Sequence, residues 1–259
     1  MPFHQFVSLD VGQSRDPSAL CIIEEPLWIP AHALEDGGWA DALNITAEAL
    51  LGESGWVSPN HPALTPPQVE EIRSINYHYG KPSRTPLHLT HLERFPLGTP
   101  YPDVVDGVIR RVKRTKLRGK HTVLMVDETG VGRAITDPFR MRGVSPYGIT
   151  ITGGDNVNWD KDTRRFRTPA RELIHKTQVA AQQGLLIAPK EGLPLAKVFQ
   201  HELRRFKVKP NRSRNNSSDR YEAWRENDTD DLVFAVSMAC WFRMHNQRLI
   251  DEANARMRR

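Results

Sequence analysis

Short apolar runs alternate with segments of helical periodicity along the chain, an order typical of an α/β protein. The runs Phe6 to Asp10 and Ala19 to Ile23 are separated by the turn-forming segment GQSRDPS, which predicts a β-hairpin. The run His121 to Asp127 has few polar positions before its last residue, and this indicates a strand buried on both faces. Further strands are expected at 87–95, 144–152 and 185–188.

Helical periodicity accounts for most of the remaining chain. In the last helix, expected to begin at Asp228 or Thr229 and to end at His245, apolar residues recur at the i, i+3, i+4 spacing of a helix packed on a core. Other helices are expected at 102–116, 133–142, 168–183 and 193–206. A hairpin followed by βαβ units predicts a mixed α/β sheet with helices on both faces.

The segment 25–86 interrupts this order with residues rich in proline, glycine and tryptophan. It contains two candidate helices, Trp39–Leu51 and Pro67–Tyr77. We interpret it as an insertion after the first hairpin, within a single domain spanning 1–259. Near the other end, the polar and basic stretch 207–220 predicts a mobile loop.

Composition narrows the class of protein. With 259 residues, of which 39% are hydrophobic, the chain can bury a substantial core. Lys and Arg number 36 against 31 Asp and Glu, and this balance favours a polyanionic partner. Cys21 and Cys240 are too few for a disulfide framework and lack zinc-site spacing. No signal peptide or membrane-spanning run is recognisable, so we expect a protein of the reducing cytoplasm with no membrane partner.

Two of the predicted strands end in aspartate. Asp10 and Asp127 each close an apolar run and lead into a glycine-bearing turn. If the strands are parallel neighbours, their ends lie about 5 Å apart, at the sheet edge where α/β proteins place their sites. Two carboxylates this close repel unless a cation lies between them. Mg²⁺ or Mn²⁺ suits such ligands, and two such ions can promote phosphodiester hydrolysis by activated water.

A third carboxylate is available at the start of the last helix. Asp228, Asp230 and Asp231 are candidates there, and Asp16 lies six residues after Asp10 in the hairpin turn. Each also has a purely structural interpretation, because aspartate is common in turns and at helix N-termini. Taken singly, each aspartate is more often structural than catalytic.

The segments LDVGQSRDPSAL, VDETGVGRAI and DDLVFAVSMA resemble, in this order, the three acidic motifs of the nuclease domain of phage terminase large subunits. That family belongs to the RNase H-like (RuvC-like) superfamily. The resemblance implies a mixed five-stranded sheet and a catalytic set of Asp10, Asp127 and Asp231, with Asp230 as the alternative third ligand and Asp16 as an auxiliary one. It further implies two bound Mg²⁺ or Mn²⁺ ions and an endonuclease that hydrolyses one DNA strand at a time.

Basic segments beside the acidic edge are expected to bind the phosphates of double-stranded DNA, in a salt-dependent manner indifferent to sequence. The predicted DNA-binding residues are Arg164, Arg165, Arg167, Arg204, Arg205, Lys207, Lys209, Arg212 and Arg214. The tract Arg110 to Lys120 is better interpreted as a solvated face.

The chain departs from large terminases in having no G-x-x-x-x-G-K-[ST] phosphate loop. DNA packaging would therefore require a separate terminase ATPase or a portal protein as partner. The resemblance implies a phage or prophage protein acting in the cytoplasm of a bacterial host. Two alternatives stay open: a nuclease that resolves Holliday junctions on the same fold, and a catalytically silent module that binds DNA or a packaging partner.

Overall fold

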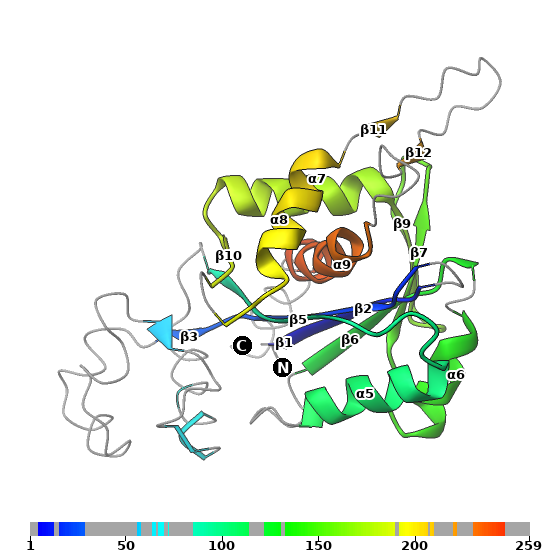
Figure 1. Cartoon of the computed structure of the whole chain (residues 1–259), viewed down its shortest axis with the longest axis horizontal. Helices are drawn as coiled ribbons and strands as arrows, with labels where there is room; N and C mark the ends of the chain where they lie inside the picture. The colour runs from blue at the N-terminus through cyan, green and yellow to red at the C-terminus, as the bar shows by residue number, and fades with distance from the viewer. Residues whose placement is uncertain are drawn as a thin grey trace, which may run out of the picture.

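The structure is a computed structural model of the chain. It describes residues 5–12, 16–28, 56–57, 64–65, 67–69, 72, 85–113, 122–130, 133–189, 192–206, 208–209, 220–221 and 230–246. Figure 1 shows the arrangement of the helices and strands within these residues.

An eight-stranded mixed sheet forms the centre of the fold, in the order β10-β5-β2-β1-β6-β7-β9-β8. Its strands are β1 (Gln5–Asp10), β2 (Ala19–Glu24), β5 (Leu87–Arg94), β6 (Thr122–Asp127), β7 (Tyr147–Thr152), β8 (Asn158–Asp160), β9 (Arg165–Pro169) and β10 (Leu186–Ile187). Two short antiparallel pairs lie outside this sheet: β3 (Leu27–Trp28) with β4 (Trp56–Val57), and β11 (Val208–Lys209) with β12 (Arg220–Tyr221).

The five central strands, β5-β2-β1-β6-β7, have the topology of an RNase H-like fold. β1 and β2 form the predicted antiparallel hairpin, and β5 lies antiparallel beside β2. β6 and β7 run parallel to β1 and to each other. The predicted fold class is therefore confirmed, including the neighbouring position of the two strands that end in Asp10 and Asp127.

The expected count of five strands is wrong, because the sheet continues at both edges. β10, which the sequence predicts at 185–188, joins β5, and the unpredicted strands β9 and β8 join β7. β9 escaped sequence analysis because arginines alternate with Phe166 and because Pro169 closes the strand. The helix expected from Thr168 begins after that proline, at Ala170.

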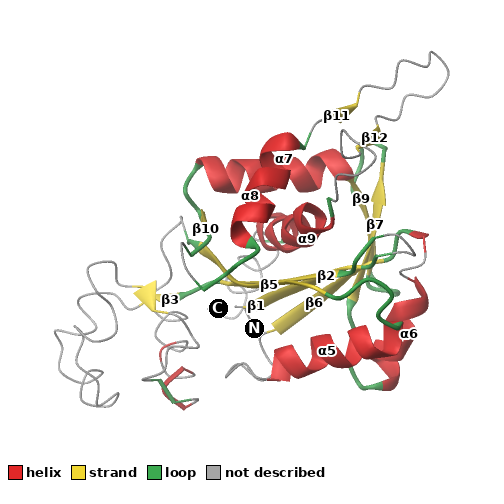
Figure 2. Ribbon diagram, viewed as in Figure 1, coloured by secondary structure: helices red, strands yellow, loops and turns green. Residues whose placement is uncertain are grey.

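Helices cover both faces of the sheet, as the sequence predicts (Figures 1 and 2). One face carries α7 (Ala170–Gln182), α8 (Ala196–Arg205) and α9 (Asp231–His245), and the other carries α5 (Tyr101–Lys113) and α6 (Arg133–Met141). The candidate helix at 39–51 lies outside the described residues. Of the candidate at 67–77, residues 67–69 and 72 are described and helical.

Two hydrophobic cores lie on the two faces of the sheet. Because side chains alternate along a strand, β1 directs Phe6 into the core under α7 to α9, and Val7 and Leu9 into the core above α5 and α6. β6 does the same, with Met125 in the first core and Val126 in the second. This alternation decides the face of the sheet to which each strand-terminal carboxylate belongs.

The predicted insertion, 25–86, falls mainly on residues that the structure does not describe, so its boundaries stay a prediction. Within it, Leu64, Val69 and Ile72 are buried. Among the described helices, none has the length and apolar character needed to cross a membrane.

Candidate functional site

The carboxyl ends of β1 and β6 bring Asp10 and Asp127 side by side. The two strands are parallel and their register pairs Leu9 with Val126, so each aspartate occupies the next position on its strand. By alternation, both side chains belong to the face that carries Met125 and the core under α9. The predicted juxtaposition of the two acids is therefore present.

The two carboxyl groups are hydrogen-bonded to each other, and this contact requires one proton between them. Burial raises the pKa of Asp10 well above its usual value, and repulsion from Asp127 raises this pKa further. Burial also raises the pKa of Asp127, but the backbone N–H of Thr129 donates to its Oδ1 at 2.7 Å and stabilises the ionised form. The electrostatics of the pair therefore favour one shared proton over two adjacent negative charges.

Two more carboxylates stand at the N-terminus of α9. Asp230 directly precedes the helix and Asp231 is its first residue, where the helix dipole favours negative charge. Both add to the repulsion that raises the pKa of Asp10, for which burial is the largest cause. Ser8 Oγ donates to the carbonyl oxygen of Ala235 at 2.5 Å, and this bond ties α9 to β1. The start of α9 is thus held beside the aspartate pair.

An arginine from β5 binds the carboxylate at the start of α9. Arg94 Nε donates to Asp231 Oδ2 at 2.7 Å, and Arg94 Nη2 donates to Asp231 Oδ1 at 2.9 Å. The same Nη2 donates to Glu202 Oε1, on α8, at 2.5 Å. Both oxygens of Asp231 therefore bind one guanidinium group, which links three elements: β5, α8 and α9.

The chemistry of the aspartate pair fits a hard divalent cation. Asp10 and Asp127 offer only carboxylate oxygens, and a cation between them would relieve the repulsion that raises the pKa of Asp10. Asp231 differs, because Arg94 already binds both of its oxygens. Over the described ranges, no three His, Cys, Asp or Glu side chains are grouped so that they could hold a metal ion.

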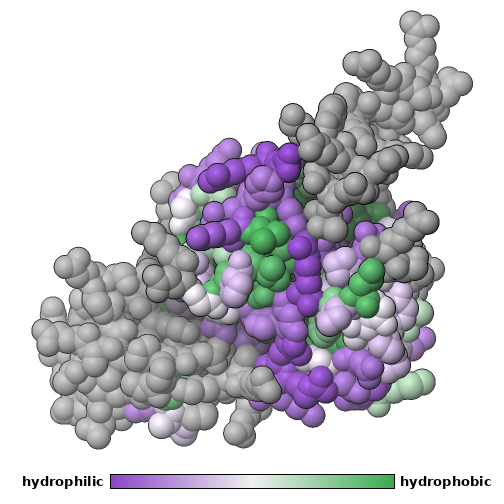
Figure 3. All heavy atoms as spheres, viewed as in Figure 1, coloured by the Kyte–Doolittle hydropathy of each residue, from purple (hydrophilic) through white to green (hydrophobic). Residues whose placement is uncertain are grey.

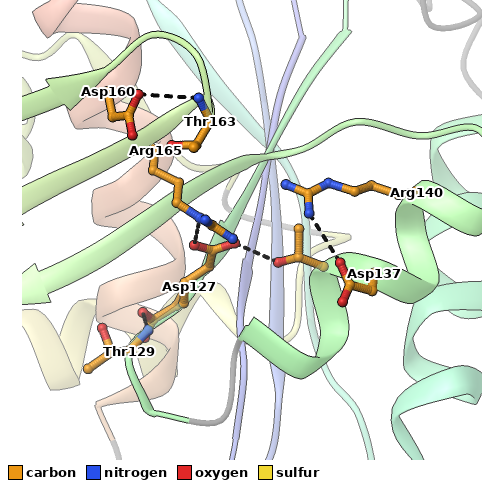
Figure 4. Close-up of polar contacts among 9 residues, drawn as sticks. Asp127, Thr129, Asp137, Arg140, Asp160, Thr163 and Arg165 are labelled. Carbon is orange, nitrogen blue, oxygen red and sulfur yellow. Dashed lines mark hydrogen bonds and ion pairs between the residues drawn. The ribbon is translucent and has the colours of Figure 1, made fainter.

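Sequence analysis missed a second carboxylate at the end of β6. Glu128 follows Asp127 and is 2% exposed. Thr136 Oγ1 donates to Glu128 Oε1 at 2.8 Å, and Arg165 Nε donates to Glu128 Oε2 at 2.7 Å. Figure 4 shows the side chain of Arg165 beside Asp127. A Cβ atom on Gly148 would lie 2.4 Å from the Glu128 carboxyl carbon, so a larger residue there would have to displace this carboxyl group from its two bonds. These contacts anchor the strand end that carries Asp127.

Two predicted DNA-binding arginines lie on β9, on either side of Phe166. The ring of Phe166 packs on Trp241 of α9, with 5.2 Å between centroids. Because side chains alternate along a strand, Arg165 and Arg167 project from the other face, away from the aspartate pair. Arg165 has a structural partner there in Glu128, a role that its sequence context does not reveal.

The other predicted DNA-binding residues divide by position. Arg164 places its guanidinium 4.2 Å from the ring centroid of Tyr147. Arg204 and Arg205 are exposed at the end of α8, within one turn of Glu202. Lys207, Arg212 and Arg214 lie outside the described residues, and Lys209 is described only as part of strand β11. DNA binding by this set stays a prediction, and Arg204 and Arg205 are its described members beside Glu202.

Asp16 is exposed in the turn between β1 and β2. A Cβ atom on Gly12 would lie 2.1 Å from the carbonyl oxygen of Asp16, so the two backbones pack against each other. The backbone N–H of Gly12 also donates to Ser18 Oγ at 3.1 Å and helps to close the turn. The structure thus assigns Asp16 a place in the turn, and a role as a metal ligand stays a prediction.

Arg94 and Glu202 were not recognised from the sequence as parts of the site. Arg94 falls in the predicted strand 87–95, and Glu202 in the predicted helix 193–206. One signal could have identified Arg94: it closes the third strand of an antiparallel meander that begins with β1. Glu202 has no comparable local signal, because its contact depends on how α8 packs over the sheet.

The solved structures that resemble this chain include a large terminase nuclease and a large terminase. The large terminase nuclease from thermophilic phage G20c has a TM-score of 0.49 and 14% identity, over 91% of this chain and 80% of that one. The HK97 bacteriophage large terminase has a TM-score of 0.41 and 11% identity, over 93% of this chain and 40% of that one. This chain thus spans less than half of the HK97 protein. No protein-family model matches the sequence, and no curated protein matches it.

Proposed function

We propose that this chain is a metal-dependent endonuclease that hydrolyses phosphodiester bonds in DNA. The observation that carries the proposal is the contact between the carboxyl groups of Asp10, which is partly buried, and Asp127, which is buried. Such a pair is electrostatically unfavourable unless a cation joins it, and paired acids of this kind gather at functional sites. The proposal is also supported by Asp231, which begins α9 on the same side of the sheet and follows the motif order of the sequence.

The proposed ions are Mg²⁺ or Mn²⁺, which when bound supply an activated water and stabilise the leaving oxygen of a phosphodiester. Asp10 and Asp127 would hold them, and Asp10 would lose its proton on binding because ligands bind in the ionised form. The Thr129 N–H orients the Asp127 carboxylate. Asp231 would complete the ligand set, with Asp230 as its alternative and Asp16 as a further ligand.

The proposed substrate is double-stranded DNA. Arg204 and Arg205 are exposed within one turn of Glu202, which is joined through Arg94 to the acidic site. Phosphate binding beside the carboxylates would hold the scissile strand against them. Figure 3 shows a continuous band of hydrophilic residues beside an apolar patch on the face where α8 lies in front of the sheet. A role in phage DNA packaging, with a separate ATPase or portal protein, is part of the proposal and rests on the motif order.

Plasmid nicking tests the activity. Supercoiled plasmid is incubated with Mn²⁺, Mg²⁺ or chelator and with wild type or the variants Asp10→Asn, Asp127→Asn and Asp231→Asn. We expect metal-dependent nicking by wild type and a loss on the order of a hundredfold or more in Asp10→Asn and Asp127→Asn. Asp137→Asn is the matched control, because the side chain of Asp137 is 70% exposed on α6.

The outcomes separate the alternatives. Nicking that persists in all three site variants would contradict the assignment of these residues. Absence of metal-dependent nicking by wild type, with DNA binding intact, would support a silent binding module instead. Symmetric cleavage of a four-way DNA junction in preference to plasmid would favour a junction-resolving nuclease.

A further inference from the structure

We infer that Arg94 is an internal counter-ion of the acidic site and competes with a divalent cation for Asp231. This inference rests on the proposed metal-dependent function and identifies a positioning residue for it. In the absence of metal, Arg94 would hold the third carboxylate in a closed ion pair. Cation binding by the full ligand set would then require Arg94 to release or share Asp231.

Strand register places Arg94 in one row with the aspartate pair. Asp10 of β1 pairs with Ala19 of β2, and Ala19 pairs in turn with Arg94 of β5. Residues directly opposite one another on neighbouring strands share a face of the sheet, so all three side chains face α9. Ala19, which lies between Asp10 and Arg94, is fully buried, and its side chain is only a methyl group. The long side chain of Arg94 can therefore reach the start of α9.

The contact with Asp231 is a bidentate, side-on salt bridge. Arg94 Nε and Nη2 each donate to a different oxygen of Asp231, at 2.7 and 2.9 Å. Paired charge-assisted bonds of this geometry are among the stronger polar contacts in proteins. The side chain of Asp231 is 5% exposed and that of Arg94 is 25% exposed, so water screens the pair weakly. A cation that binds Asp231 must compete with these two bonds.

Glu202 gives Arg94 a second carboxylate. Its side chain is 11% exposed and accepts from Arg94 Nη2 at 2.5 Å. When a cation takes an oxygen of Asp231, the guanidinium group can keep its contact with Glu202 and stay paired. The contact also connects the site to α8, which ends at the exposed residues Arg204 and Arg205. Glu202 would therefore allow Arg94 to change between two states: paired with both Asp231 and Glu202, or paired with Glu202 alone.

The expected size of the competition follows from the bonds that must change. A factor of ten in affinity corresponds to about 1.4 kcal/mol, which is no more than a single hydrogen bond between charged groups contributes. Removal of the guanidinium group also removes a positive charge close to the site. We therefore expect metal affinity to rise about tenfold or more when Arg94 is replaced by a neutral residue.

The test measures Mn²⁺ binding without DNA, by calorimetry and by the electron paramagnetic resonance of unbound Mn²⁺. Arg94→Gln should bind Mn²⁺ about tenfold more tightly than wild type. Arg94→Lys keeps the charge but cannot present the planar fork to both oxygens, so its affinity should also rise, by a smaller factor. Arg142→Gln is the control: it removes one positive charge from a surface pair with Asp106, away from the site.

Unchanged or weaker Mn²⁺ binding by Arg94→Gln would overturn the inference. If Arg94→Gln does not fold, as judged by circular dichroism, unchanged Mn²⁺ binding by Arg94→Lys would overturn the inference instead. An equal gain in Mn²⁺ affinity in Arg142→Gln would mean that the effect comes from net charge, and this result would also overturn the inference. Failure of the proposed function gives a different result: wild type would bind no Mn²⁺, or binding would survive both Asp10→Asn and Asp127→Asn.

Discussion

Replacement of Asp10 by asparagine is expected to stabilise the metal-free protein at neutral pH. Asp10 is partly buried and in contact with Asp127, so the folded protein must either hold a proton there or tolerate two adjacent charges. Asparagine has nearly the same shape, and its Nδ2 can donate to Asp127 as the protonated carboxyl group does. The substitution thus preserves the contact and removes the need for a proton.

Two separate estimates give about the same upper limit for the gain in the free energy of unfolding. Unit charges 4 Å apart repel by about 4 kcal/mol at an effective dielectric constant of 20. Holding any aspartate protonated at pH 7 costs about 1.4 kcal/mol for each unit above its unfolded pKa of about 3.9, hence about 4 kcal/mol at most. Because desolvation of the amide offsets part of the gain, we expect a stabilisation of about 1–3 kcal/mol, with about 2–4 °C in Tm for each kcal/mol.

The stabilisation by Asp10→Asn should depend on pH. Folding raises the pKa of Asp10, chiefly through burial, so its contribution to stability is fully present below the unfolded pKa and is lost as the pH rises through the folded pKa. The asparagine variant has no such loss. Its advantage over wild type should therefore be small near pH 4 and should grow towards pH 7.

The assay is thermal and urea unfolding in the presence of chelator, at pH 4 and at pH 7, with Asp137→Asn as the control for loss of an exposed carboxylate. Added Mg²⁺ should stabilise wild type and leave Asp10→Asn nearly unaffected. An Asp10→Asn variant less stable than wild type at pH 7 would refute the reasoning. So would an advantage of equal size at the two pH values, because it would not arise from the shared proton.

Two further predictions concern the anchoring of β6. Gly148→Ala should destabilise the protein by about 1–3 kcal/mol, because the added methyl would lie 2.4 Å from the carboxyl carbon of Glu128; an unchanged urea midpoint would mean that Glu128 moves aside at no cost. Arg165→Gln should cost about 2–3 kcal/mol, because it leaves Glu128, with a side chain 1% exposed, without its ion-pair partner. Arg167→Gln, on the same strand, should stay within about 0.5 kcal/mol of wild type in the same measurement, and equal losses in the two variants would contradict a structural role for Arg165.

Local patterns in the sequence were enough to predict most of the regular elements. The apolar runs of β1 and β6 predicted buried strands, and the spacing of Leu232, Ala235 and Val236 predicted the last helix. These signals depend on the period of side chains along one element, which is a local property. The positions of Asp10 and Asp127 at strand ends follow from the same patterns, and their contact follows once the strands are neighbours.

Strands β8 and β9 were harder to predict because the helix that covers them, α9, is distant in the sequence. β8 and β9 contain more charged than apolar residues, yet Trp159 of β8 stacks on Phe166 of β9 with 4.1 Å between ring centroids. Phe166 is covered in turn by α9, which begins at Asp231. Pairing of this kind depends on packing between separate elements, and alternation within five residues does not reveal it.

The sequence by itself determined which carboxylates stand at the ends of strands and at the start of the last helix, because hydrophobic alternation and turn residues act over short distances. The tertiary structure alone decided what these carboxylates contact. The register across β1, β2 and β5 brings Arg94 to Asp231, and the packing of α8 adds Glu202. The physical reason is that the protonation and the ion pairs of a buried acid depend on the charges and burial around it, and these are set by elements more than a hundred residues apart.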